Sequence, residues 1–149
     1  MQTNNTNSGG NPLLTDYGPR PFVINIDRAT KQNSMFRTAL WTGDNLQLVL
    51  MSISPGESIG LEVHPGHDQF IRIEQGQGIV MMGDAKDNLT LRRNVFEGIA
   101  FIVPSGTWHN LINTGTRPLR LYTVYAPPEH AHGTIRATKA DAVAQETQH

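Results

Sequence analysis

The stretch GLEVHPGHDQFIRIEQG, from Gly60 to Gly76, joins chemically active side chains to a pattern typical of β-strands. Side chains of an extended chain alternate between two faces, so Glu62 and His64 share one face. Pro65-Gly66 suits the two central positions of a type II turn, in which glycine supplies the positive φ. The chain is therefore expected to reverse and to return as a strand that begins with Gln69. If Gln69 points inward, then Glu62, His64 and Gln69 converge inside a β container.

Short β-branched or alternating runs continue on both sides of this stretch. Turn sequences divide them at roughly the 8- to 12-residue intervals of a sandwich or barrel. The runs are FVINI, FRTALWT, LQLVLMSI, IGLEVH, QFIRI, GIVMMG, NLTLRR, GIAFIVP, HNLIN and PLRLYTVYA. Short helices are expected only at 27–33 and at about 139–147. The sequence therefore predicts an all-β fold of antiparallel strands, closed on themselves or stacked as two sheets.

A second stretch, GIAFIVPSGTWHNLIN, places a turn before His109. Its fixed positions, Gly98, Pro104, Gly106, His109 and Asn113, have the spacing of the second motif of the cupin family, which the chain resembles. Residues 56–76 have the spacing of the first cupin motif. Through FRTALWTG, HPGHDQFIRIEQGQG, PSGTWHN and YAPPEHAHGT, the chain also resembles a bacterial subgroup of small one-domain cupins without an assigned substrate. The resemblance implies a single cupin-type β-barrel, which is a double-stranded β-helix or jelly roll.

The resemblance also implies a metal site, because the ligand positions of cupins are occupied in this chain by Glu62, His64, Gln69 and His109. The cupin pattern has His, His and Glu where this chain has Glu62, His64 and Gln69, so the donor set departs from it. Two imidazoles and one carboxylate with open positions suit non-haem Fe(II), and the same donors accept Mn, Ni, Cu or Zn. Gln69 offers only a neutral oxygen. The expected proton acceptor is therefore Glu62, a metal-bound hydroxide or a group of the substrate itself.

Structural interpretations of the same residues remain open. His64 and His109 could each satisfy a buried backbone group or cap a turn, as isolated histidines commonly do. Glu62 and Gln69 could form a hydrogen-bonded pair in a barrel that has lost its metal. The spacing and the carboxylate beside His64 favour the metal site over these alternatives.

Three further histidines lie outside the predicted ligand set. His67 sits at the turn, so we expect it in solvent or at the barrel mouth rather than among the ligands. His130 and His132 alternate in PPEHAHG, where the prolines favour an exposed loop. A lid over the barrel is the alternative interpretation of that segment.

Length and composition limit the other possibilities. The 149 residues suit one domain, and we expect a disordered tail over 1–12 and a single cupin domain over 13–149, with a C-terminal extension from about 127. The formal net charge is -1 and basic residues are scattered, so no nucleic-acid partner is expected. The chain has no cysteine, so any metal has N and O ligands. No secretion signal or membrane-length apolar run is evident, which favours a cytoplasmic protein without a membrane partner.

These observations lead to three hypotheses of function. The first is a metal-dependent cupin enzyme that uses one divalent ion (Fe, Mn, Ni, Cu or Zn) on a small-molecule substrate, as a dioxygenase-type oxidoreductase or as an isomerase of a sugar or small acid. The second is a non-catalytic cupin that binds or senses a sugar or acid. The third is a metal-free epimerase with His64 as base and Tyr122 as acid. Cupins commonly dimerise, so we expect a homodimer through edge segments near Phe22–Ile26 or Phe36–Trp41.

Overall fold

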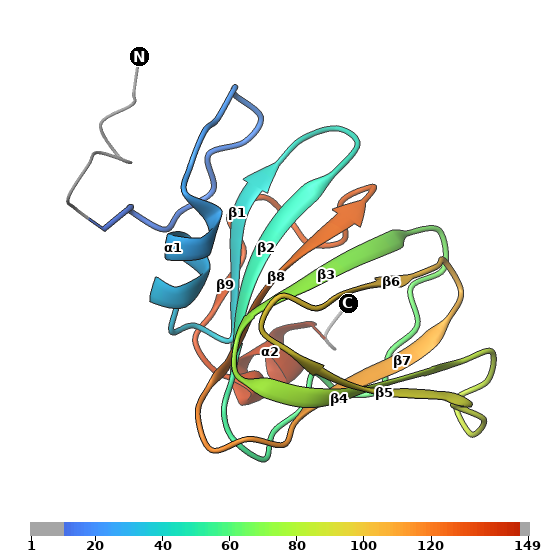
Figure 1. Cartoon of the computed structure of the whole chain (residues 1–149). Helices are drawn as coiled ribbons and strands as arrows, with labels where there is room; N and C mark the ends of the chain where they lie inside the picture. Colours follow the sequence, from blue (N-terminus) through green and yellow to red (C-terminus); the bar gives the residue numbers. More distant parts are fainter. Residues whose placement is uncertain (1–10, 147–149) are drawn as a thin grey trace.

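The computed structural model describes residues 11–146 and shows two antiparallel sheets that face each other (Figure 1). The predicted tail over 1–12 lies outside the described residues except for 11 and 12. In chain order the elements are α1 (Ile26–Gln32), β1 (Arg37–Thr42), β2 (Gln47–Ile53), β3 (Asp68–Gln75), β4 (Gln77–Gly83), β5 (Leu91–Phe96), β6 (Ala100–Val103), β7 (Trp108–Asn113), β8 (Leu119–Ala126), β9 (Ile135–Arg136) and α2 (Lys139–Glu146).

The larger sheet has the strand order β6-β3-β8-β2-β1-β9, and the smaller sheet has the order β5-β4-β7. The connection from β2 to β3 joins the two sheets through single antiparallel bridges to β7, at Ser58–Ile112 and Glu62–His109. Backbone hydrogen bonds thus close the sheets into a barrel, which removes free strand edges along this seam. The predicted all-β jelly-roll fold is confirmed.

Two predicted strands are wrong. Ile59–His64 makes only isolated bridges, because Gly60 takes a φ of 95° and interrupts the extended backbone. FVINI is an irregular segment that leads into α1, whose first turn is capped by Asn25 Oδ1 accepting from the Arg28 amide at 3.0 Å. Both predicted short helices are confirmed. Phe36–Trp41 is not a free sheet edge, since β1 lies between β2 and β9, and the homodimer stays a prediction.

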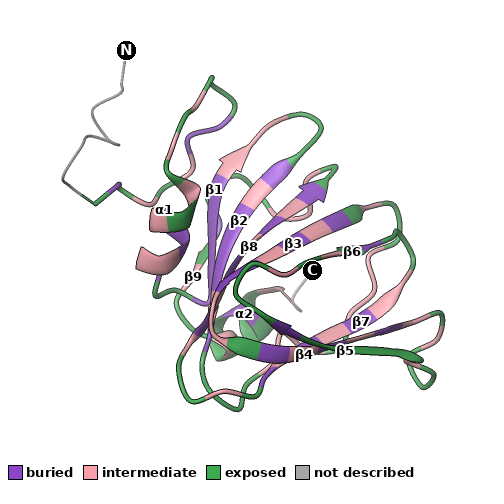
Figure 2. Cartoon of the chain, in the orientation of Figure 1, coloured by how far each residue is buried: buried purple, intermediate pink, exposed green. Residues whose placement is uncertain are grey.

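The inner faces of the sheets bury one apolar cluster, which includes Ile71, Val80, Leu111 and Leu121. A second cluster, built around Tyr17, Ala29, Leu40 and Leu50, lies on the outer face of the larger sheet, under the N-terminal segment and α1. The part of the larger sheet formed by β1, β2 and β8 is therefore covered on both faces. Figure 2 shows the contrast with β5, where five of six residues are exposed. The smaller sheet therefore packs against the rest of the protein mainly through its inner face.

Asn113, the last motif position, has a structural role. Its buried side chain donates to the carbonyls of Ile53 and Arg117 at 2.8 and 2.9 Å and accepts from the Gly115 amide at 2.8 Å. One amide thus satisfies three backbone groups at the end of β7 and ties the turn into β8 to the end of β2. This explains an asparagine at that position without any part in the chemistry.

Candidate metal centre

Three of the predicted site residues meet at one end of the barrel. Glu62 and His64 lie on the β2–β3 connection and His109 lies on β7, and their ligand atoms are all within 4.8 Å of one another. His64 Nε2 is 3.1 Å and His109 Nε2 is 3.7 Å from the same oxygen, Glu62 Oε1. Two backbone hydrogen bonds of 2.9 Å between Glu62 and His109 anchor the connection to β7. The barrel closure therefore also sets the positions of the cluster.

His109 presents one ring nitrogen toward this cluster without a partner. Its side chain is 1% exposed, and Nδ1 lies 3.0 Å from the Thr107 carbonyl, so we assign the proton to Nδ1. Nε2 is then a lone-pair donor, and among residues 11–146 it has no hydrogen-bond partner. Burial lowers the pKa of His109 and keeps the ring neutral. A buried, neutral imidazole with an unused lone pair has the properties of a metal ligand.

His64 lies between two carboxylates. Nε2 faces Glu62, and Nδ1 is 3.5 Å from Glu129 Oε2. Burial opposes protonation of His64, but the hydrogen bonds and charges of Glu129 and Glu62 outweigh it and raise its pKa to about 9. The two carboxylates thus favour positive charge at His64, which a proton or a divalent ion can supply. An imidazole with one nitrogen toward a cluster and the other toward a carboxylate is a recurring ligand arrangement.

Gln69 contributes to the same wall from β3. Its side chain points inward as predicted, is 4% exposed, and donates from Nε2 to Thr123 Oγ1 at 3.0 Å. Its Oε1 is buried without a hydrogen-bond partner in the described part of the chain. Because an unpaired buried acceptor is costly, this oxygen fits a site that receives a cation or a substrate donor. Together with His109 Nε2, it makes the residues present compatible with a bound divalent ion.

Two cavities adjoin the cluster. A small inner cavity of about 10 Å³, large enough for about one water, is bordered by Glu62, Gln69 and Arg37. A larger hollow of about 310 Å³ lies between the Ile59–Glu62 segment and α2, and it too is bordered by Glu62 and Arg37. We interpret the larger hollow as the entrance to the site and the small cavity as its inner end. Glu62 and Arg37 face both.

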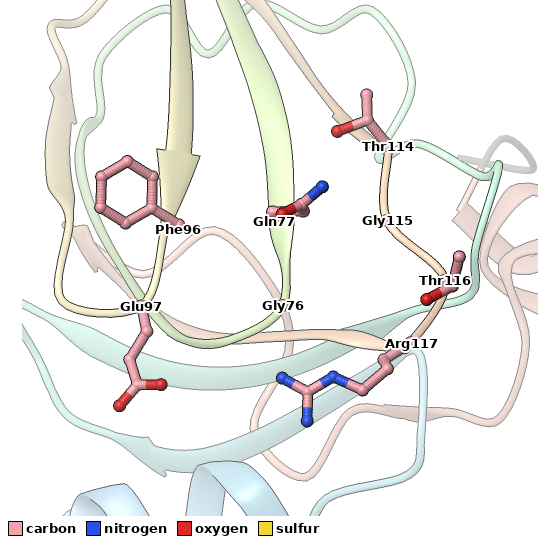
Figure 3. A pocket seen from close by; sticks show the side chains of 8 residues that line it. All are labelled: Gly76, Gln77, Phe96, Glu97, Thr114, Gly115, Thr116 and Arg117. Atoms are coloured by element: carbon pink, nitrogen blue, oxygen red, sulfur yellow. The ribbon is translucent and has the colours of Figure 1, made fainter.

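A hollow of similar size, about 330 Å³, lies elsewhere on the barrel (Figure 3). It is formed where β3 ends and β4 begins, at the opposite end of β3 from Gln69. Gln77, Phe96, Glu97 and Arg117 surround it, and none of its eight lining residues is a histidine. Its size alone therefore does not make it the site of chemistry.

Of the three histidines outside the predicted ligand set, two lie where we expected them and one does not. His67 lies at the mouth as expected, with Nε2 3.2 Å from Glu129 Oε1, and His132 is exposed as expected, with a side chain 54% accessible. The exposed loop predicted for His130 is wrong, since its ring packs edge-on against Tyr125 and its side chain is only 12% accessible. Gln47 accounts for this, because it donates to the His130 carbonyl and accepts from the His130 amide.

Several residues that contact the site were absent from the predicted set. Glu129 contacts His64 and His67, so the PPEHAHG segment reaches over the mouth as in the lid interpretation. The Tyr125 ring is 5.7 Å from the His64 ring, whereas Tyr122, the acid of the epimerase hypothesis, packs in the outer cluster. The alternation of side chains along β8 could have indicated that Tyr125 points toward the site, since Thr123 and Tyr125 share the inner face of this strand. Nothing local in the sequence identifies Arg37 as part of the mouth.

A jelly-roll barrel with a His and Glu cluster at its mouth defines a class of protein, and the chain belongs to it: residues 49–125 match the cupin domain, and the protein is a member of the cupin family. It is 65% identical to the uncharacterized protein YrkC of Bacillus subtilis (strain 168), over 91% of this chain and 73% of YrkC. It is 42% identical to the uncharacterized protein L612 of Acanthamoeba polyphaga mimivirus, over 76% of this chain and 70% of L612.

A solved structure agrees with this assignment. The crystal structure of BH2720 from Bacillus halodurans superposes with a TM-score of 0.87 at 60% identity, covering 87% of this chain and 98% of that one. Neither helix within residues 11–146 has the length and apolar character needed to cross a membrane.

Proposed function

We propose that this cupin is a metal-dependent enzyme that converts a small molecule at the barrel mouth, with Glu62, His64 and His109 as the ligands of one divalent ion. The observation that carries the proposal is the buried His109 Nε2, which faces Glu62 and has no hydrogen-bond partner among the described residues. Leaving such a nitrogen unpaired is costly unless a ligand uses it. Gln69 Oε1, equally buried and unpaired, is a fourth, neutral donor at the same wall.

The chain's own residues then have distinct tasks. Thr107 fixes the His109 tautomer through its carbonyl, and Glu129 holds the His64 ring from the other side. Glu62 faces both cavities, so its carboxylate is the group that meets an entering molecule and accepts a proton from it. A bound divalent ion would polarise a substrate oxygen or, with Fe, Mn or Cu, support oxidation. Within this proposal we rank oxidoreductase chemistry as the first alternative and isomerisation as the second.

Elemental analysis tests the metal site directly. Untagged protein purified without chelator is compared with a His64→Ala/His109→Ala variant and with a His132→Ala control, which removes an exposed histidine. We expect near-stoichiometric Fe, Mn, Ni, Cu or Zn in the parent and the control, and none in the double variant. An empty parent that also fails to take up added divalent ions would refute the metal-dependent enzyme.

A non-catalytic binding role is the second candidate. The bond from Gln69 to Thr123 favours it, because a neutral, already anchored amide is a weaker metal donor than the glutamate of the cupin pattern. Oxygen consumption by metal-loaded protein separates the two candidates. Uptake that depends on an added small acid or sugar supports the oxidoreductase, whereas tight ligand binding without any change in the ligand supports the binding role.

A further inference from the structure

Arg37 is a buried cation at the point where the two cavities meet. Its side chain is 3% exposed, and it borders both the inner cavity beside Gln69 and the larger hollow under α2. A guanidinium in such a place requires an anion, since burying an unpaired charge is strongly unfavourable. Within residues 11–146 its acidic partner is Glu146, whose two carboxylate oxygens accept from Nη1 at 2.8 and 2.7 Å. The Arg37 Nε–H is buried and unpaired among the same residues.

The carboxylate that neutralises Arg37 comes from a short helix that buries few of its residues. Glu146 is the last residue of α2, and in this helix only Ala142 is buried. The Glu146 side chain is 28% accessible, and its other charged neighbours, Arg136 Nε and His130 Nδ1, are 3.7 and 3.8 Å away. With so little buried apolar area, this helix is held mainly by the Arg37 pair and by Lys139 Nζ donating to Ser58 Oγ at 3.0 Å, so its docking is sensitive to competition for Arg37. Glu146 can therefore leave while Arg37, fixed in β1, remains.

We propose that Arg37 is the receptor for the carboxylate of a small organic acid, and that Glu146 occupies this receptor until the acid displaces it. The proposal names the substrate class of the metal site and therefore rests on the proposed function. Displacement keeps Arg37 paired with a carboxylate throughout, which is the exchange that a buried guanidinium permits. It also leaves Arg37, fixed in β1, as the basic residue of the barrel wall that borders the hollow.

The cavities define the shape of this acid. The carboxylate that replaces Glu146 would enter from the larger hollow, which Glu146 borders, whereas the inner cavity of about 10 Å³ beside Arg37 has room for about one water. Glu62 borders the same two cavities, so the rest of a bound acid would meet its carboxylate. A hydroxyl or carbonyl beside the carboxylate would then reach the cluster, while a second carboxylate would meet Glu62. The geometry favours a monocarboxylate with an adjacent oxygen, such as a 2-hydroxy acid.

Glycolate is a suitable probe, and glycolamide is its uncharged counterpart. Binding to the full chain is measured by NMR titration after chelator treatment, following the Arg37 Nε–H signal. Replacing Glu146 with glutamine removes the competing carboxylate, so Glu146→Gln should tighten glycolate binding by about tenfold or more. Asp141→Asn, on an exposed part of the same helix, should leave the affinity unchanged. Glycolamide should not bind either protein.

An Arg37→Met/Glu146→Met variant tests the role of Arg37 without leaving one charge unpaired in the protein. Replacing a buried ion pair by apolar groups of similar size is often tolerated. It should not bind glycolate. Affinity within twofold of the parent in Glu146→Gln, or glycolate binding that persists in the double variant, would overturn the proposal. The metal-free assay separates the two proposals, since Arg37-dependent binding in a protein that takes up no metal refutes only the metal-dependent enzyme. Metal-loaded protein without Arg37-dependent binding refutes only this inference.

Discussion

Replacing Glu129 with glutamine tests how the segment over the mouth controls His64. Glu129 Oε2 lies 3.5 Å from His64 Nδ1, and with Glu62 it raises the His64 pKa from 6.5 to about 9. That difference corresponds to about 3.5 kcal/mol, at about 1.4 kcal/mol per pH unit. If Glu129 supplies about half, Glu129→Gln should lower the His64 pKa by slightly more than one pH unit and stability by about 1.7 kcal/mol.

The sign of the pH dependence follows from the raised pKa. The folded state holds the His64 proton more tightly than the unfolded state, so this stabilisation is complete below pH 6.5 and disappears as the pH rises through about 9. The unfolding free energy of chelator-treated protein should fall across that window, less steeply in the variant. His130 acts in the opposite sense and at lower pH, because burial, aided by Arg37, lowers its pKa to about 3. Stability should therefore decline as the pH falls from 6.5 toward 3.

Two measurements test the effect of Glu129 on His64. NMR titration of the His64 ring gives its pKa directly, and competition with a chelator gives the metal affinity, which should weaken by about 10- to 100-fold when a carboxylate behind a ligand is lost. Glu97→Gln, an exposed glutamate beside the distant hollow, is the matched control. An unchanged His64 pKa in Glu129→Gln would show that Glu129 does not act on His64, and would refute the assignment of the raised pKa to this carboxylate.

Three other variants test the fold and the site. Asn113→Ala should lower the unfolding free energy by about 3 kcal/mol in urea titration, because it leaves three backbone groups without their partner; a loss below about 1 kcal/mol would contradict this role. Gly76→Ala should destabilise more than Gly98→Ala, although both glycines have φ near 90°, because a Cβ at Gly76 would lie 2.9 Å from the Pro118 carbonyl oxygen and one at Gly98 meets nothing within 4 Å; equal melting temperatures would argue against this difference. Gln69→Glu should bind metal about tenfold more tightly and, when metal-free, melt at lower temperature because it loses the donor to Thr123; weaker metal binding would place Gln69 away from the ion.

The strands and the central cluster could be predicted from the sequence because their signals are local. Alternation placed Gln69 and Ile71 on the inner face of β3, and the spacing of the motifs aligned His64 with His109. The β2–β3 connection was mispredicted as a strand because the alternation of IGLEVH conceals a glycine at positive φ. Strand pattern alone cannot reveal that conformation, which depends on the bridges to β7.

The residues around the mouth could not be predicted because they depend on long-range packing. Glu129, Arg37 and Glu146 come from the C-terminal loop, from β1 and from α2, and they meet only after the barrel has closed. Gln47 similarly holds His130 against the barrel from more than eighty residues away in sequence. Proline content predicted an exposed loop there, and tertiary hydrogen bonds overrode it.

The unequal covering of the two sheets has a consequence for how the site can adapt. Gln69 stands on β3 of the larger sheet, in which β2, two strands away, is buried on both faces, while His109 stands on β7 of the smaller sheet, whose edge strand β5 is largely exposed. Amide protons of β5 should therefore exchange with deuterium well before those of β2. We therefore expect the wall that carries His109 to move more readily than the wall that carries Gln69 and Thr123, so that molecules of slightly different width are accommodated on the His109 side.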